Sequence, residues 1–112
     1  MASWTIYNKI TGKAITTQTG DSLKRAVEAA VKAGVSLADA SLVMADLQDA
    51  DLRGATLTRA DLTGAILDRA VLASASLANA VLNYTHVEET KFKGCDTSGA
   101  STTGQTGKNK EN

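Results

Sequence analysis

Two side chains in this sequence could act together as a nucleophile and a base, Cys95 and His86. Each is the only residue of its type, so the chain holds one thiol, one imidazole and no internal disulfide. A thiol nucleophile needs a base within hydrogen-bond reach. A structural zinc site needs four Cys or His ligands, which this composition cannot supply. Catalysis therefore depends on whether the fold brings these two residues, or a pair of carboxylates, into one cleft.

The element that must position them is a repeat of five residues, which begins at residue 35. Leu holds the third place of ten consecutive repeats, from Leu37 to Leu82, and Ala the first place of nine, from Ala40 to Ala80. A period of five matches neither a helix, at 3.6, nor a strand, at 2. It fits a coil in which each repeat forms one side and then turns a corner. The first and third residues then point inward, and stacked coils lie about 4.8 Å apart.

This register separates the two reactive residues. His86 falls at an outward second place, whereas Cys95 falls at an inward first place and is interpreted as a small core residue. The carboxylates lie on a convex wall, whereas enzymes hold them in a cleft that excludes water. Glycines such as Gly54 and Gly64 fall singly at fifth places, so no phosphate-binding loop is present. We expect a protein without catalytic activity, cofactor or metal.

The A-[D/S/T]-L-x-x units resemble the pentapeptide-repeat family over about sixty residues. That resemblance implies an all-β solenoid, a right-handed quadrilateral β-helix with four repeats in each coil. Residues 35–97 would then form about three coils, and residues twenty apart would lie above one another on the same side. The repeat weakens from Thr85 onward.

The two ends do not follow the repeat. Residues 3–7 and 14–17 have the alternation and β-branched content of a small β-hairpin. Asp21-Ser22 is a helix-start signal, an apolar stripe follows it, and Gly34 suits the helix end. Residues 1–34 are therefore predicted to be a hairpin and one capping helix over the open end of the solenoid. Residues 98–112 lack large apolar side chains and are predicted to be a disordered polar tail.

Twelve basic and twelve acidic residues give a net charge of zero, which argues against direct nucleic-acid binding by bulk charge. Sorting the repeats by side reveals a polarised cylinder. The third side, which contains residues 45–49, 65–69 and 85–89, carries five acids against Arg69. The fourth side has a net charge of +2. We call the five acidic residues the acidic wall; they are Asp46, Asp49, Asp68, Glu88 and Glu89.

Relatives in the family that this sequence resembles act as DNA mimics, either as phage-encoded anti-CRISPR proteins or as protectors of DNA gyrase. A wall of five carboxylates has a charge comparable with one face of a duplex of similar height. The leading hypothesis is therefore a phage-derived DNA-mimic inhibitor of anti-CRISPR type. Its partner would be a bacterial DNA-binding complex, either a CRISPR surveillance complex or a topoisomerase. We expect it to be cytoplasmic, away from membranes, and a monomer or weak dimer.

Three alternatives remain open. A gyrase-binding pentapeptide protein would use the same wall on a different target. A general protein-interaction scaffold would use an apolar set on the second side, which we call the apolar patch: Val43, Met44, Val81 and Tyr84. A hydrolase or transferase would need His86. The acids can also be purely structural, because Arg69 falls between Asp49 and Glu89 in a ladder of surface charges, and exposed pairs of this kind add at most about 1 kcal/mol.

Overall fold

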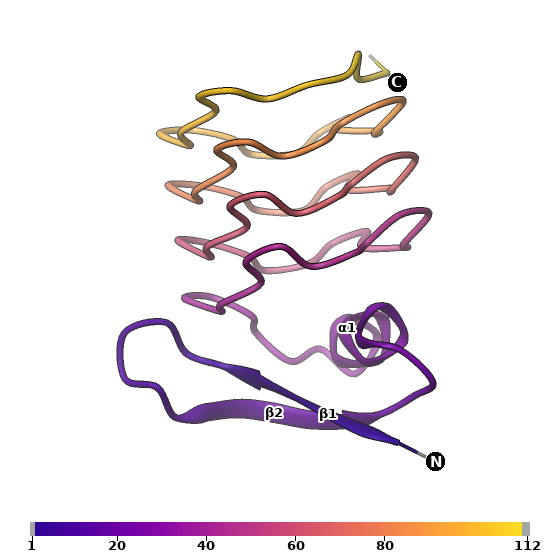
Figure 1. The fold of residues 1–112 in the computed structure, drawn as a ribbon, viewed down its shortest axis with the longest axis vertical. Helices are drawn as coiled ribbons and strands as arrows, with labels where there is room; N and C mark the ends of the chain where they lie inside the picture. The colour runs from indigo at the N-terminus through magenta and orange to yellow at the C-terminus, as the bar shows by residue number, and fades with distance from the viewer. Residues whose placement is uncertain (1, 111–112) are drawn as a thin grey trace.

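In the computed structural model, which describes residues 2–110, a stack of square coils rises from a hairpin and a helix (Figure 1). Strands β1 (Ser3–Tyr7) and β2 (Ala14–Thr19) pair antiparallel, with a β-bulge between Ile6 and Tyr7. The turn between them is held by Asn8, whose Oδ1 accepts hydrogen bonds from the backbone N–H groups of Ile10 and Thr11. The predicted hairpin is confirmed.

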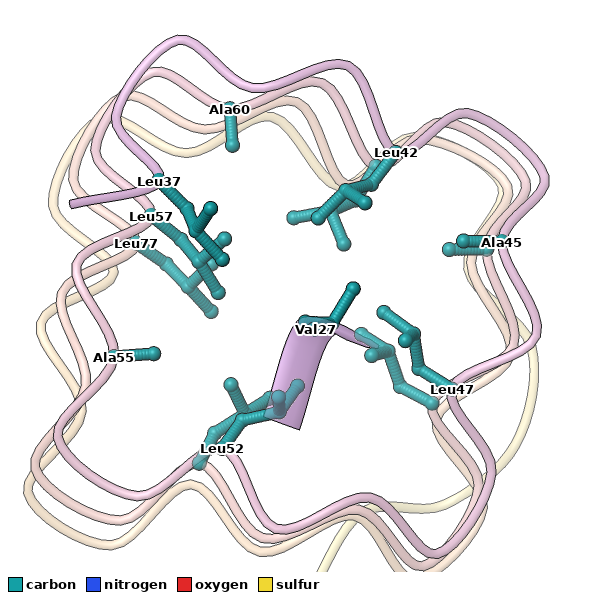
Figure 2. Close-up of a cluster of buried hydrophobic side chains, with 14 of the residues drawn as sticks. Val27, Leu37, Leu42, Ala45, Leu47, Leu52, Ala55, Leu57, Ala60 and Leu77 are labelled. Carbon is teal, nitrogen blue, oxygen red and sulfur yellow. The ribbon is translucent and has the colours of Figure 1, made fainter. Parts of the chain in front are cut away.

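Helix α1 (Leu23–Lys32) follows, as its start signal predicted. The Oγ of Ser22 accepts a hydrogen bond from the backbone N–H of Arg25 at 3.2 Å, which caps the helix. Gly34 has a φ of +76°, the left-handed conformation that glycine adopts after a helix end. Ala26, Val27 and Ala30 of the apolar stripe are buried, whereas Leu23 and Val31 are partly buried. Val27 points into the interior of the coil (Figure 2).

Residues 35–110 form the coil, and its backbone pairs in parallel with a spacing of twenty residues. Asp46 pairs with Ile66, and Ile66 pairs with His86 one coil further. Within these residues the pairs are isolated bridges, not continuous strands, because each side is only a few residues long between two turns. Viewed along the axis, the chain turns clockwise from Leu37 through Leu42 to Leu47 as it recedes, which is a right-handed coil (Figure 2).

The inward register is confirmed by burial. Every third-place Leu from Leu37 to Leu82 and every first-place Ala from Ala40 to Ala80 is at most 4% exposed. Beyond them the interior becomes polar, and two buried first-place residues satisfy their hydroxyl groups on backbone carbonyls. Thr85 Oγ1 donates to Leu82 O at 2.8 Å, and Thr90 Oγ1 donates to Leu67 O at 2.7 Å.

Each corner is a tight turn that returns the chain to the next side. The N–H of Ala45, for example, donates to the carbonyl of Leu42 at 3.1 Å. Every fifth-place residue from Asp39 to Gly104 has a positive φ, including bulky ones such as Met44 (+61°) and Tyr84 (+62°). The corner conformation therefore does not depend on glycine, although non-glycine residues adopt it at a cost.

The predicted cap protects the lower edge of the first coil. The N–H of Ser41 donates to Tyr7 O and the N–H of Lys9 donates to Asp39 O, both at 2.8 Å. On the opposite side, Glu28 of α1 accepts a hydrogen bond from the backbone N–H of Asp51, also at 2.8 Å. Hairpin and helix thus satisfy backbone groups that an open coil would leave unpaired.

The upper end differs from the prediction. Residues 98–110 continue the coil and are not disordered: the N–H of Ser101 donates to Ala80 O and that of Thr106 to Thr85 O, each at 3.0 Å. The solenoid therefore extends past residue 97 to nearly four coils, and residues 111–112 lie outside the described chain. Backbone pairing with the coil below orders this segment, although its side chains offer almost no apolar surface.

Candidate functional site

The structure keeps the two reactive side chains apart. His86 is exposed on the third side, where its Nδ1 lies 3.2 Å from Thr106 Oγ1. Cys95 is half-buried at the first side, and burial, together with Asp96, raises the pKa of its thiol to about 11. A buried, protonated thiol is a poor nucleophile. Among residues 2–110, no three His, Cys, Asp or Glu side chains gather closely enough to hold a metal ion.

The lower part of the acidic wall is compensated by Arg69. Its Nε donates to Asp49 Oδ1 at 2.8 Å and its Nη2 to Asp49 Oδ2 at 3.2 Å, across one coil. This hydrogen bonding holds the pKa of Asp49 below its ordinary value. The same Nη2 donates to Gln48 Oε1 at 3.3 Å. Asp49 is therefore part of a structural pair, the lower half of the predicted ladder, whereas Glu89 at its upper end lies closest to Lys110.

Three other carboxylates of the wall have no basic group within 4 Å among the described residues: Asp46, Asp68 and Glu88. Asp46 Oδ1 accepts from the backbone N–H of Gln48 at 3.2 Å and from its side-chain amide at 3.1 Å. Asp68 Oδ1 accepts from the backbone N–H of Glu88 at 3.0 Å. These neutral donors order Asp46 and Asp68 without cancelling their charge. Together with Glu88 these side chains form the unpaired part of the wall among the described residues.

Sequence reasoning missed a cation beside the wall, Lys110, and the backbone pairing that brings its segment there. Lys110 Nζ lies 3.6 Å from Glu89 Oε1, and the carbonyl of Lys108 accepts from the N–H of Glu89 at 2.7 Å. Both lysines belong to the segment that was expected to be disordered. A signal was available, because Gly99 and Gly104 continue the five-residue spacing of the earlier corner glycines. The wall is therefore less negative than the sequence predicted.

The helix adds a further cation at the base of the wall. Ser22, Leu23 and Lys24 line a shallow groove against Asp46 and Asp49, and the charge of Lys24 also lowers the pKa of Asp49. The sequence analysis treated the cap and the wall separately, so it did not foresee this contact. A partner of the wall would therefore meet its most negative surface in the second and third coils, at Asp68 and Glu88.

The apolar patch is largely as predicted. Val43, Met44 and Tyr84 are 47%, 71% and 60% exposed, whereas Val81, expected to be exposed with them, is half-buried. Two residues of the patch lie flat along their corner column. A Cβ on Gly64 would come within 2.3 Å of Met44 Sδ, and one on Gly104 within 2.5 Å of the Tyr84 ring. Each large side chain thus covers the glycine one coil above it.

A second groove lies between α1 and the fourth side, and its charges are mostly paired. Arg25 Nη1 lies 2.8 Å from Glu28 Oε1, and Arg53 Nη2 lies 2.7 Å from Asp51 Oδ2. Hydrogen bonding to Arg53 lowers the pKa of Asp51 to about 2. The basic character predicted for this side is therefore weakest at its base.

No helix within residues 2–110 is long and apolar enough to cross a membrane. The arrangement as a whole is convex, with charge and apolar surface segregated on neighbouring sides. Such a surface can bind a macromolecule but offers little enclosure to a small substrate.

Comparison with protein families finds that the family described as pentapeptide repeats matches residues 33–69, in eight copies. A search of the curated proteins found no match. Among solved structures, a pentapeptide repeat protein from the cyanobacterium Cyanothece 51142 is 29% identical, with a TM-score of 0.40 over 61% of this chain and 44% of that one.

Two further solved structures are similar. One is a pentapeptide repeat protein involved in heterocyst differentiation regulation in Nostoc sp. strain PCC 7120, at 30% identity and a TM-score of 0.33 over 58% of this chain and 35% of that one. The other, from the Arabidopsis thaliana thylakoid lumen, is 21% identical, with a TM-score of 0.35 over 62% of this chain and 56% of that one. This chain thus spans between 35% and 56% of the length of these proteins.

Proposed function

We propose that this chain, which carries pentapeptide repeats, is a non-catalytic protein-binding solenoid that acts as a DNA mimic. Its acidic wall would occupy the DNA-binding groove of a nucleic-acid-handling complex. The observation that supports the proposal is a set of three carboxylates on one side of a molecule with zero net charge: Asp46, Asp68 and Glu88, which have no basic group within 4 Å among residues 2–110.

The spacing of these charges supports the comparison with DNA. Asp68 and Glu88 occupy the same place in successive coils, about 4.8 Å apart along the axis. A duplex carries one charge per about 1.7 Å of axis, counted over both strands and all directions. One face of the duplex therefore presents a charge every few ångströms. The stacked carboxylates of Asp68 and Glu88 approach that charge density. A basic groove would also steer such a wall at long range.

The separation of the reactive side chains supports a role in binding over one in catalysis, because neither His86 nor Cys95 lines either of the two grooves beside α1. His86 and Cys95 are on different sides, one exposed and the other half-buried. The partner would be a bacterial complex with a basic DNA groove, such as a CRISPR surveillance complex of the kind that phage anti-CRISPR proteins block, or a topoisomerase.

The test uses neutral substitutions that keep hydrogen-bond acceptors in place. The triple variant Asp46→Asn, Asp68→Asn, Glu88→Gln removes three charges from the wall. A matched control removes three charges from the first, second and fourth sides, as Asp39→Asn, Asp51→Asn and Asp61→Asn. Both are compared with the parent in competition with duplex DNA for a purified gyrase and a purified surveillance complex, over a salt series.

We expect the parent to displace DNA more weakly as salt rises. The wall variant should lose at least about tenfold in affinity, whereas the control should change little. Equal loss in both triple variants, or displacement that does not depend on salt, would show that the wall is not the binding surface. If the parent displaces DNA from neither complex, a pull-down from bacterial lysate at low and high salt is the next search for a partner.

A further inference from the structure

The apolar patch has no role in the proposed DNA mimicry and lies on a different side from the unpaired carboxylates. We propose that it is the contact surface between two copies of this chain, which form a weak, reversible dimer about a two-fold axis. The inference concerns the second side of the coil, formed by residues 40–44, 60–64, 80–84 and 100–104.

Stacking brings the patch together from distant segments. Val43 and Met44 belong to the first coil, whereas Val81 and Tyr84 belong to the third, two coils above on the same side. The backbone of Tyr7 adjoins this side, because its carbonyl accepts from the N–H of Ser41. The second side therefore carries large exposed apolar groups in both the first and the third coil, more than a single scattered surface residue.

The surface is also flat enough to meet its own copy. Met44 and Tyr84 do not project from the corner but lie over Gly64 and Gly104, one coil above each. A column that alternates a large side chain with a glycine is nearly smooth along its length. Two smooth faces can approach closely over several coils. Contacts through a few protruding side chains would hold the two faces apart.

Charge favours a second copy over a charged partner. Residues 40–44, 60–64, 80–84 and 100–104 include one residue that is charged at neutral pH, Asp61, whose Oδ1 accepts from the backbone N–H of Thr63 at 3.0 Å and from its hydroxyl at 2.5 Å. Burying this side would therefore leave few charges without a partner, which is the character of an interface core. Two faces that carry one carboxylate each repel each other only weakly, and a two-fold axis buries the same patch on both copies.

The available area sets the strength of the contact. Four coils at about 4.8 Å give a side roughly 19 Å tall, and the molecule is 21 to 26 Å across. The side can therefore bury roughly 400–500 Å² on each copy, or about 1,000 Å² in total, the lower limit for a specific interface. The dimer should accordingly be weak and depend on protein concentration.

Sedimentation equilibrium from low micromolar to millimolar protein tests the proposal. The variant Tyr84→Asp places a charge in the patch, and Ser74→Asp is its matched control on the fourth side. Both positions are fifth-place corners with a φ of +62°, and Asp39 and Asp49 already adopt that conformation, so both substitutions suit the backbone. Val43→Lys is a second patch variant that leaves the corner residue intact, and thermal melting checks that each variant is folded.

The weight-average mass of the parent and of Ser74→Asp should rise from 11.6 kDa toward twice that value as concentration increases. Tyr84→Asp and Val43→Lys should remain monomeric over the same range. A parent that stays monomeric at the highest concentration overturns the proposal and leaves the patch to a different partner. So does a dimer that both patch variants retain, or one that Ser74→Asp weakens to the same extent. Because these variants keep the acidic wall intact, the result is independent of the DNA-mimic proposal.

Discussion

Arg69 lies one coil above Asp49, and the two side chains meet through two hydrogen bonds, Nε to Oδ1 at 2.8 Å and Nη2 to Oδ2 at 3.2 Å. Twenty residues separate them in sequence, so this contact exists only because one coil contains twenty residues. It is the same relationship that joins Arg59 to Asp39 on the first side. On the third side it lowers the charge of the wall, whereas on the first side it affects no candidate site.

Replacing Arg69 by Gln should therefore expose more negative charge on the wall with little loss of stability. An exposed pair contributes at most about 1 kcal/mol, so the melting temperature should fall only slightly. On an anion-exchange column, Arg69→Gln should elute at higher salt than Arg59→Gln, because only the former adds net charge to a side that is already acidic. Identical elution would mean that the wall does not dominate the surface potential, since both variants have the same net charge.

A charge in the interior should abolish the fold. Leu62 is 1% exposed at the centre of the coil, so Leu62→Asp buries an unpaired carboxylate and should cost more than about 3 kcal/mol. Circular dichroism should show loss of the cooperative melt. The control Ser41→Asp places the same group at an exposed second place, where Asp46 and Asp51 occur naturally, and should melt like the parent. A cooperative melt of Leu62→Asp near that of the parent would contradict the inward register.

The effects on stability of substituting Met44 and of substituting Gly64, one coil above it, should be coupled. Gly54 and Gly64 have φ values of +71° and +70°, but a Cβ on Gly54 meets open space whereas one on Gly64 meets Met44. Gly54→Ala should cost about 1 kcal/mol from backbone strain alone, and Gly64→Ala should cost more. Chemical denaturation of Met44→Ala, Gly64→Ala and the double variant measures the difference. Additive effects within about 0.3 kcal/mol would mean that Met44 does not rest on Gly64.

The thiol of Cys95 should react slowly and with a steep pH dependence. Burial raises its pKa to about 11 from an ordinary 9.0, so the thiolate fraction below pH 9 should be about a hundredfold lower than for a free thiol. The rate of modification by a chromogenic disulfide should rise about tenfold per pH unit up to pH 10. Unfolding in guanidinium chloride should restore the ordinary rate. A fast reaction of the folded protein at pH 7 would contradict the position of Cys95 in the interior.

The last coil should be the least stable part of the solenoid. Its third-place residues are Thr97, Thr102 and Gly107 where the first two coils have Leu, so it buries little apolar surface. Amide hydrogen exchange should be faster over residues 96–110 than over residues 45–87. Thr97→Leu should slow that exchange and raise the melting temperature, whereas Ser98→Leu, at an outward place, should do neither. Uniform protection from exchange between residue 45 and residue 110 would contradict this difference in stability.

Two parts of the candidate surface, the acidic wall and the apolar patch, could be predicted from the sequence. The five-residue spacing assigns an inward or outward position to each side chain, and the twenty-residue coil sorts the outward ones by side. That was enough to group the acidic wall and to place Val43 on the same side as Tyr84. The compensation of the wall was only partly foreseeable. Arg69 could be stacked between its neighbours, but Lys24 and Lys110 reach the wall from segments outside residues 35–97, where the repeat was recognised.

The sequence by itself determined the interior of this protein, because Ala and Leu at fixed places leave one register that buries them all. It also determined the cap, through an alternating hairpin and an N-capped apolar stripe. Only the tertiary structure decided where the coil ends and how negative the wall is. Residues 98–110 have no hydrophobic pattern to reveal them, and they are ordered by hydrogen bonds to the coil below. Backbone groups are the same in every residue, so pairing between distant segments leaves little trace in the order of side chains.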